Sequence, residues 1–155
     1  VRRIAIRGEV WYMNPHASFS TLKRQFQLYK KELRTHGHSL PGDVPVAREM
    51  FVASSKKEAE AIARPFLEAK YKTYSLWGQD KTISSKENFS TSFDLLSEDR
   101  FTLGAPDAVI ESLIKYKNLG ATHLTLRLGW PGMSKKHVES AVLLTTKEVI
   151  PALQA

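Results

Sequence analysis

The sequence predicts an α/β fold in which parallel strands alternate with helices, and three observations predict it. Segments with the period-two pattern of strands alternate with segments of helical periodicity, as in β-α units with right-handed crossovers. The 155 residues, 42% of them hydrophobic, suffice for one domain with a core. Only three strands are clear, however, and a parallel sheet of three strands leaves its edges and a face poorly covered. The pattern therefore predicts a sheet with more strands than the three that this chain contains.

The first third of the chain predicts two strands around a helix. Residues 1–8 are typical of a helix end capped by glycine, and residues 9–14 (EVWYMN) form a short aromatic run typical of a strand. A helix from about Ser18 or Ser20 to His36 carries one apolar stripe and one basic face. Residues 46–53 (VAREMFVA) predict the second strand. Each face of that strand carries one charge near its start, so the sequence does not tell its inner face from its outer face.

The middle of the chain predicts a helix followed by a long irregular excursion. The sequence SKKE at residues 55–58 is a capping box that opens the helix, and Pro65 predicts a kink or a division within it. Residues 75–96 lack clear periodicity, and excursions of this length are often lids or binding loops. Within the excursion, Trp77 is either a lid aromatic or a packing residue.

The stretch from Arg100 to Met133 predicts a helix followed by a tight turn and a strand. Pro106 begins a helix and Gly120 ends it, and residues 122–128 follow with period two. The leucines of this strand are expected to meet covering helices, which turns Thr125 and Arg127 toward the opposite side. Arg127 would then either face a ligand at the carboxyl end of the strand or pair with a carboxylate there. A last helix begins after Ser134.

Composition excludes several classes of function. The net charge of +7 is spread over helix faces without a recognisable nucleic-acid-binding module, and no apolar run is long enough to span a membrane. Cysteine is absent, which favours a reducing compartment, so we expect a cytoplasmic protein with no nucleic-acid or membrane partner. His36 and His38 lack further ligands nearby, and we expect no metal site. Glycine-rich phosphate loops and serine nucleophile elbows are also absent.

Three motifs in this order resemble the carboxyl-terminal half of the bacterial luciferase-like flavin-dependent monooxygenases. They are F-x-L-G-x-P-x-x-V-I from Phe101, L-x-L-R-x-x-W-P-G-M from Leu124 and E-V-I-P-x-L from Glu148. The resemblance implies a partial (β/α)₈ TIM barrel in which residues 1–155 form the carboxyl-terminal portion. Residues 9–14, 46–53 and 122–128 would be its last three strands, and residues 75–96 would be a variable excursion.

The resemblance also implies a function. Members of the family use reduced flavin mononucleotide (FMN) and dioxygen to oxidise an organic substrate, and some use a deazaflavin to transfer hydride. It implies four cofactor-binding candidates, Met13, Asn14, Arg127 and Trp130, and names no catalytic residue. His16 lies beside the first two and is a further candidate for lining the site. The family builds its phosphate-binding loop upstream of the segment that matches residues 1–3, so we expect this chain alone to bind flavin weakly.

Two alternatives remain open on the sequence. The first is a non-catalytic truncated homologue that acts as a structural or partner subunit, and the second is a deazaflavin-dependent reductase. The chain begins at Val1 without an initiator methionine, which predicts a processed, trimmed or partial chain. Its expected partners are a small organic substrate and either the missing amino-terminal half of the barrel or further copies of itself.

Overall fold

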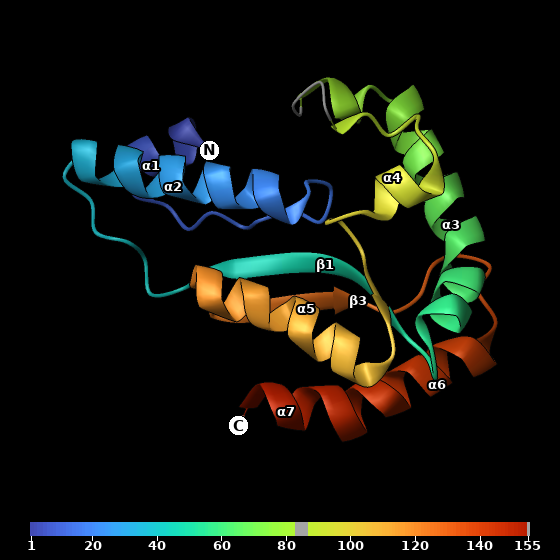
Figure 1. Cartoon of the computed structure of the whole chain (residues 1–155). Coiled ribbons are helices and arrows are strands. Elements are labelled where there is room, and N and C mark those ends of the chain that lie inside the picture. Colours follow the sequence, from blue (N-terminus) through green and yellow to red (C-terminus); the bar gives the residue numbers. More distant parts are fainter. Residues whose placement is uncertain (83–86, 155) are drawn as a thin grey trace.

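A three-stranded parallel sheet organises the computed structural model, which describes residues 1–82 and 87–154 (Figure 1). The central strand β1 (Pro45–Val52) pairs on one side with β3 (His123–Arg127) and on the other with β2 (Thr102–Gly104). All pairs are parallel, as the alternation of strands and helices predicts. The carboxyl ends of β1 and β3 point toward α3 (Lys56–Leu76), which stands beside that edge of the sheet (Figure 1).

Helices pack around the sheet, and α3 lies beside the carboxyl ends of its strands (Figure 1). The remaining elements are α1 (Arg2–Ile6), α2 (Phe19–Thr35), the 3₁₀ helix η1 (Gln79–Thr82), α4 (Phe93–Ser97), α5 (Pro106–Leu119), α6 (Lys135–Leu144), the π-helix η3 (Thr145–Val149) and α7 (Ile150–Gln154). The last three follow one another without a break. Serine side chains cap the long helices, since Ser18 accepts from the Thr21 N–H and Ser55 from the Glu58 N–H. No helix in the described part of the chain is long and apolar enough to cross a membrane.

Residues 9–14 do not form the strand that the sequence predicts. They contribute a single bridge, in which the Met13 N–H donates to the Pro45 carbonyl (3.0 Å) and the Met13 carbonyl accepts from the Ala47 N–H (2.8 Å). The ladder stops there because Pro15 has no N–H to donate. On the other side, the Tyr29 hydroxyl of α2 donates to the Glu9 carbonyl, so this end of the segment follows the helix instead of the sheet.

The short strand β2 lies where the sequence suggests only a loop. Its three residues pair with residues 50–52 of β1, next to the Met13 bridge along the same edge. A segment of three residues is too short to display a period-two pattern, so pairing alone defines it. Pro65 lies within α3, which continues through it without a division, and the alternative of a kink stays a prediction. The predicted excursion holds η1 and α4, although residues 83–86 lie outside the described residues.

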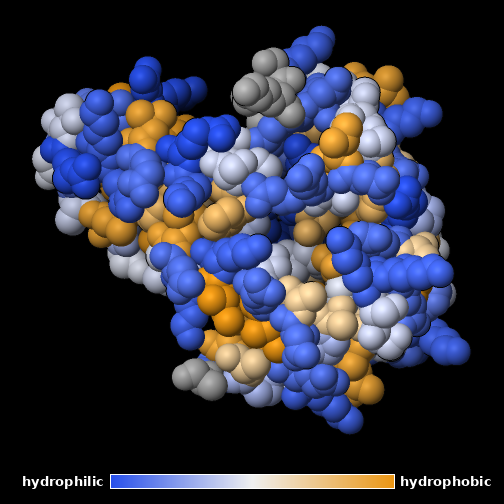
Figure 2. Space-filling model, viewed as in Figure 1, coloured by the Kyte–Doolittle hydropathy of each residue, from blue (hydrophilic) through white to orange (hydrophobic). Residues whose placement is uncertain are grey.

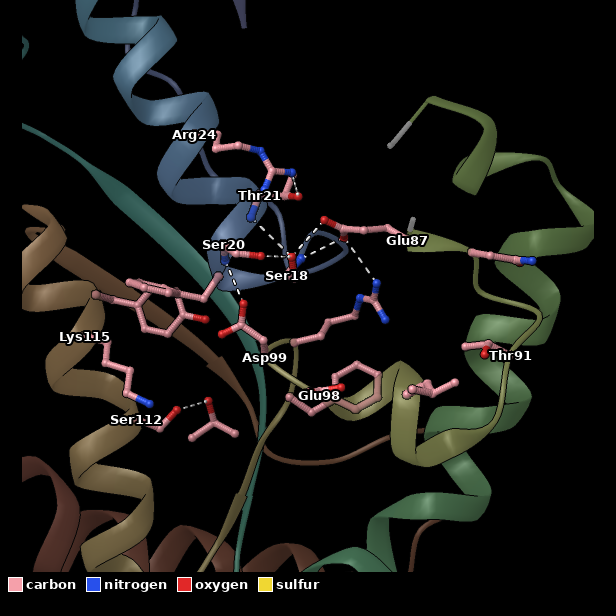
Figure 3. A pocket seen from close by; sticks show the side chains of 17 residues that line it. Ser18, Ser20, Thr21, Arg24, Glu87, Thr91, Glu98, Asp99, Ser112 and Lys115 are labelled. Atoms are coloured by element: carbon pink, nitrogen blue, oxygen red, sulfur yellow. Dashed lines mark hydrogen bonds and ion pairs between the residues drawn. The ribbon is translucent and has the colours of Figure 1, made fainter. Parts of the chain in front are cut away.

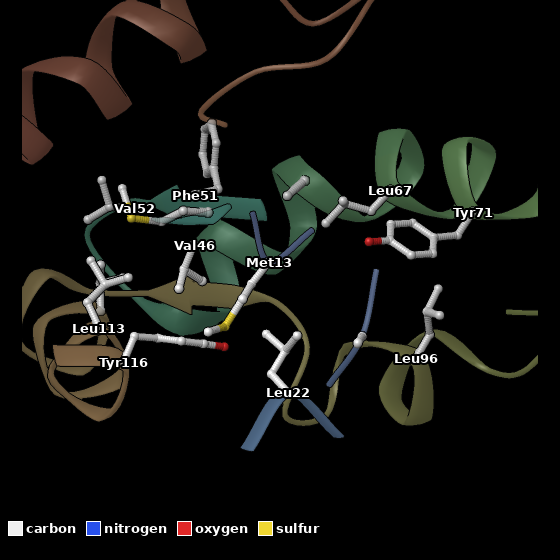
Figure 4. Packing of buried hydrophobic residues seen from close by; sticks show 14 of the residues in the cluster. Met13, Leu22, Val46, Phe51, Val52, Leu67, Tyr71, Leu96, Leu113 and Tyr116 are labelled. Atoms are coloured by element: carbon white, nitrogen blue, oxygen red, sulfur yellow. The ribbon is translucent and has the colours of Figure 1, made fainter. Parts of the chain in front are cut away.

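The two faces of the sheet have different environments. Residues paired across parallel strands share a face, so Val46 lies beside Leu124 and Glu49 lies beside Arg127. The Val46 face is covered by helices, and its core includes Met13, Leu22, Leu113 and Tyr116 (Figure 4). Leu124 and Leu126 of β3 lie on this same face and pack against the core. His123, Thr125 and Arg127 of β3 lie on the opposite face and are exposed. The predicted orientation of this strand is confirmed.

Candidate functional site

One cavity has a volume of about 830 Å³ and lies on the helix-covered side, between the start of α2, α4 and α5 (Figure 3). In the space-filling view, a notch separates the α2 end of the molecule from the α3 end, and hydrophilic side chains cover most of this face (Figure 2). The large cavity is lined mainly by polar residues of these elements.

Two acids that line this cavity, Glu87 and Asp99, accept hydrogen bonds from the start of α2. The buried Glu87 carboxylate accepts from the Ser18 N–H (2.9 Å), the Ser18 hydroxyl (2.8 Å) and Nη2 of Arg100 (3.2 Å). Burial by itself raises the pKa of Glu87, but hydrogen bonds from Thr21, Ser18 and Arg100 hold that pKa below its ordinary value. Asp99 accepts from the Ser20 N–H (2.8 Å) at the same helix start. Glu87 and Asp99 are thus occupied in holding the start of α2, which explains these two acids without a ligand.

The second cavity, of about 540 Å³, lies at the carboxyl ends of β1 and β3, between α3 and the loop that follows β3. Barrels of parallel strands place their ligands at this edge. The lining residues are Phe66, Ala69, Lys70, Thr73, Tyr74, Arg127, Gly129, Trp130 and Pro131. The cavity therefore combines aromatic and apolar side chains with two cations.

Glu49 is the centre of the polar groups beside this cavity. Its side chain is fully buried, and it points to the sheet face that bears Arg127. Its Oε2 accepts from the indole Nε1 of Trp130 (2.8 Å), and its Oε1 accepts from Nζ of Lys70. Nη1 of Arg127 lies 3.6 Å from the same Oε1. A buried carboxylate without partners would be strongly destabilising, and these three contacts offset the cost of burying Glu49.

The charges of this group do not cancel. One carboxylate faces two cations, and their exposure differs, because the Lys70 side chain is 12% exposed and the Arg127 side chain 52%. Lys70 is held against Glu49, whereas Arg127 reaches toward solvent. The site is consequently positive on the side that opens to the cavity.

His16 lies next to the same group. Its ring contacts Tyr74 at a centroid distance of 4.8 Å and Tyr71 at 6.1 Å. Burial, followed by the charge of Lys70, lowers the pKa of His16 from 6.5 to about 4. The imidazole is therefore neutral at neutral pH, with a donor and an acceptor nitrogen.

Two buried arginines hold the loop that carries His16. Arg48 donates from Nη2 to the Asn14 carbonyl (2.8 Å) and from Nη1 to the Ala17 carbonyl (3.0 Å). Arg100 donates from Nε to the His16 carbonyl (2.9 Å). The loop carbonyls thus point toward guanidinium groups, which hold the backbone that carries His16.

Comparison with known proteins identifies the family. The family model for luciferase-like monooxygenases matches residues 1–123. This chain belongs to the luciferase-like monooxygenase family. No curated protein matches it significantly. Its fold is a partial (β/α)₈ barrel, as the sequence predicts.

Solved structures resemble this luciferase-like chain over nearly its whole length. The oxygenating constituent of 3,6-diketocamphane monooxygenase from Pseudomonas putida, a type II Baeyer-Villiger monooxygenase in complex with FMN, is 20% identical, with a TM-score of 0.67. An F420-dependent secondary alcohol dehydrogenase with an F420-acetone adduct is 18% identical (TM-score 0.62), and the coenzyme F420 dependent tetrahydromethanopterin reductase from Methanopyrus kandleri is 16% identical (TM-score 0.60). The matches cover 98%, 99% and 99% of this chain but 45%, 46% and 49% of those chains. At these identities the likeness shows the fold, and the chain spans just under half the length of each neighbour.

The structure brings together two of the four residues that the resemblance suggests for the cofactor. Arg127 and Trp130 both line the second cavity and both contact Glu49. Met13 is fully buried and shares the helix-covered face with Val46. Asn14 is exposed, and its Oδ1 accepts from the His16 N–H (3.0 Å) to close a turn. Neither Met13 nor Asn14 lines a described cavity, and their cofactor role stays a prediction.

Sequence reasoning does not single out Glu49 or Lys70. The charge on each face of the second strand is the available signal for Glu49, but it does not show which face is inner. Lys70 is one of 23 basic residues and lies in an ordinary amphipathic helix. Among residues 1–82 and 87–154, no three metal-binding side chains come together.

Proposed function

We propose that this luciferase-like chain forms the carboxyl-terminal strands of a barrel that binds a flavin or deazaflavin coenzyme and oxidises a small organic substrate, with reduced FMN and dioxygen as the first candidate chemistry. One observation carries the proposal. A buried carboxylate, Glu49, gathers Lys70, Arg127 and Trp130 at the carboxyl ends of parallel strands, on the sheet face that bears Arg127.

The residues at the second cavity suit one wall of a coenzyme site. Phe66, Tyr74 and Pro131 offer apolar surface to a flat ring system, and the positive side offers Arg127 to an anionic group. In flavoenzymes the coenzyme supplies the redox chemistry, while the protein binds it, orients it and excludes water. The neighbours named above with FMN or F420 in their structures support a coenzyme of this kind.

The individual roles follow from the contacts. Glu49 fixes the indole of Trp130 and the amine of Lys70, so neither side chain moves freely at the site. The neutral imidazole of His16 is suited to exchanging a hydrogen bond with a substrate oxygen, and Arg48 and Arg100 hold its loop. We assign no catalytic acid or base.

Titration with FMN and with F420, followed by coenzyme fluorescence, tests this proposal on two proteins. For the 155-residue chain we expect weak binding, with a dissociation constant above about 1 µM, because one wall of a site leaves most of a ligand in water. For the product of the whole reading frame that encodes it, we expect tighter binding of one of the two coenzymes. Sub-micromolar binding by the short chain would contradict the half-site, and no binding by the whole product would contradict the coenzyme function.

The choice of coenzyme separates monooxygenase from reductase. A monooxygenase oxidises reduced FMN while one atom of dioxygen enters the product and the other leaves as water, whereas a deazaflavin-dependent reductase transfers hydride without consuming dioxygen. Oxygen uptake and F420 absorbance, measured with candidate alcohols and ketones, therefore distinguish the two.

A second candidate function is a non-catalytic subunit, and the exposed face of β3 favours it. Thr125 and Arg127 are exposed on β3, which is an edge strand of the sheet, and unpaired strand edges tend to pair with another chain. Sedimentation analysis separates the cases, because a structural subunit forms a stable assembly without either coenzyme. A monomer that gains coenzyme affinity only as part of a longer product would exclude it.

A further inference from the structure

The second cavity joins a positive group to an aromatic wall. We propose that it binds a small organic anion, with a flat apolar body against Tyr74 and Phe66 and a carboxylate or phosphate on Arg127. This inference deepens the proposed function and rests on it for the location of the site, but its ligand class follows from the cavity alone.

The first step concerns charge. Glu49 already receives Nζ of Lys70 on Oε1 and the indole N–H of Trp130 on Oε2. Arg127 approaches no closer than 3.6 Å, and half of its side chain is exposed. Glu49 is its sole ion-pair partner in the part of the chain that the structure describes. A guanidinium has five N–H groups in a planar fork, so most of the donors of Arg127 are available to an anion.

The second step concerns shape. Tyr74, which lines the cavity, contacts the rings of both His16 (centroid distance 4.8 Å) and Trp77 (5.9 Å). Trp77 is 69% exposed, so burial in a core does not explain it. The Trp77 ring is tilted by 39° from that of Tyr74, so the indole adds aromatic surface beside the cavity-lining ring. The volume of about 540 Å³ lies within the range of small-molecule sites.

The third step concerns the source of the anion. A coenzyme phosphate and a substrate carboxylate present the same chemistry to Arg127, namely two or more oxygens that accept paired hydrogen bonds. Both sources require the cation, and they differ in the molecule that carries the charge. Matched pairs of probes therefore separate them.

The test uses the product of the whole reading frame that encodes this chain and two pairs of probes. The two members of each pair differ in charge. FMN and riboflavin differ only in the phosphate, and 2-naphthoate and 2-naphthamide differ in the carboxylate. Binding is followed by quenching of tryptophan fluorescence. In the unsubstituted protein we expect the anionic member of at least one pair to bind about tenfold more tightly than the neutral one, as charge-assisted hydrogen bonds imply.

The variant Arg127→Gln should remove that preference and leave the affinity for the neutral probe unchanged. The matched control is Arg34→Gln, which removes the same charge from an exposed position near the end of α2. It should keep the full preference. Sodium chloride gives a second measurement in the unsubstituted protein, because salt should weaken binding of the anionic probe only, whatever the folding of the variant.

The outcomes are distinct. A preference confined to the flavin pair assigns the anion to the coenzyme, and a preference confined to the naphthyl pair assigns it to the substrate. Equal binding within both pairs, or a preference that survives both Arg127→Gln and salt, overturns the inference. If the unsubstituted protein binds neither flavin but prefers 2-naphthoate to 2-naphthamide, the proposed function is contradicted while the anion site is supported.

Discussion

Glu49 and Trp130 are 81 positions apart in the chain and are joined by a 2.8 Å hydrogen bond from the indole Nε1 to Oε2. The bond connects the central strand β1 to the loop after β3. Because Lys70 of α3 binds the same carboxylate, three elements meet at one buried charge. Because Lys70 and Trp130 also line the second cavity, the contacts that shape this cavity are the same ones that join β1 to its neighbours.

Replacement of Glu49 by glutamine should therefore destabilise the protein. The amide keeps the shape but loses the negative charge, which leaves Lys70 and Arg127 without their counter-ion. We expect the free energy of unfolding to fall by about 3 kcal/mol, in line with the loss of one partner from a buried ion pair. Urea denaturation measures it. Glu68→Gln, at an exposed position of α3, the helix that carries Lys70, should stay within about 0.5 kcal/mol of the unsubstituted protein.

The pKa of His16 predicts a pH dependence with a definite sign. The folded protein holds this pKa near 4, below the ordinary value of 6.5, so the unfolded chain binds the proton more readily between these values. The contribution of His16 is complete above pH 6.5 and is lost as the pH falls toward 4. Unfolding experiments at several pH values check this against His16→Gln. The stability difference between the two proteins should shrink from pH 7 to pH 4, and a constant difference would contradict the assignment.

Arg48 should be among the least replaceable residues outside the apolar core. It is fully buried and donates to the carbonyls of Asn14 and Ala17 and to the Tyr116 hydroxyl (3.1 Å). Arg48→Met leaves two loop carbonyls without donors, so we expect a loss of about 3 kcal/mol in urea denaturation. Arg48→Lys should recover only part of it, because an ammonium does not reproduce the planar fork. Full recovery would mean that charge alone matters.

The two faces of β3 should respond differently to substitution. Leu126 packs against the core, and Leu126→Ala should lower the free energy of unfolding by about 2 kcal/mol. Thr125 is exposed on the other face, and Thr125→Glu should leave the stability of the chain unchanged within about 0.5 kcal/mol.

The same Thr125→Glu variant reports on association. If a partner or further strands cover this face, the buried charge should prevent assembly, and sedimentation analysis should show a smaller species than the unsubstituted protein forms. An assembly that tolerates the glutamate would place the interface elsewhere.

The sequence by itself determined the features that depend on neighbouring residues. Ser18 and Ser55 cap helices, Gly120 ends one in the left-handed conformation (φ +111°), and the period-two leucines orient β3. These signals act within a few residues, so they can be read directly from the pattern. The order of motifs also pointed to the family.

Only the tertiary structure decided which segments pair and which charges meet. Residues 9–14 have the composition of a strand yet make one bridge, while residues 102–104 become a strand because the edge of β1 is available to them. Glu49 meets Lys70 and Trp130 across 21 and 81 positions. The pairing of Glu49 beside Arg127 in the sheet, together with the placement of α3 at its carboxyl edge, brings these side chains together. Local sequence does not encode such contacts, because their energies arise only when distant elements have packed.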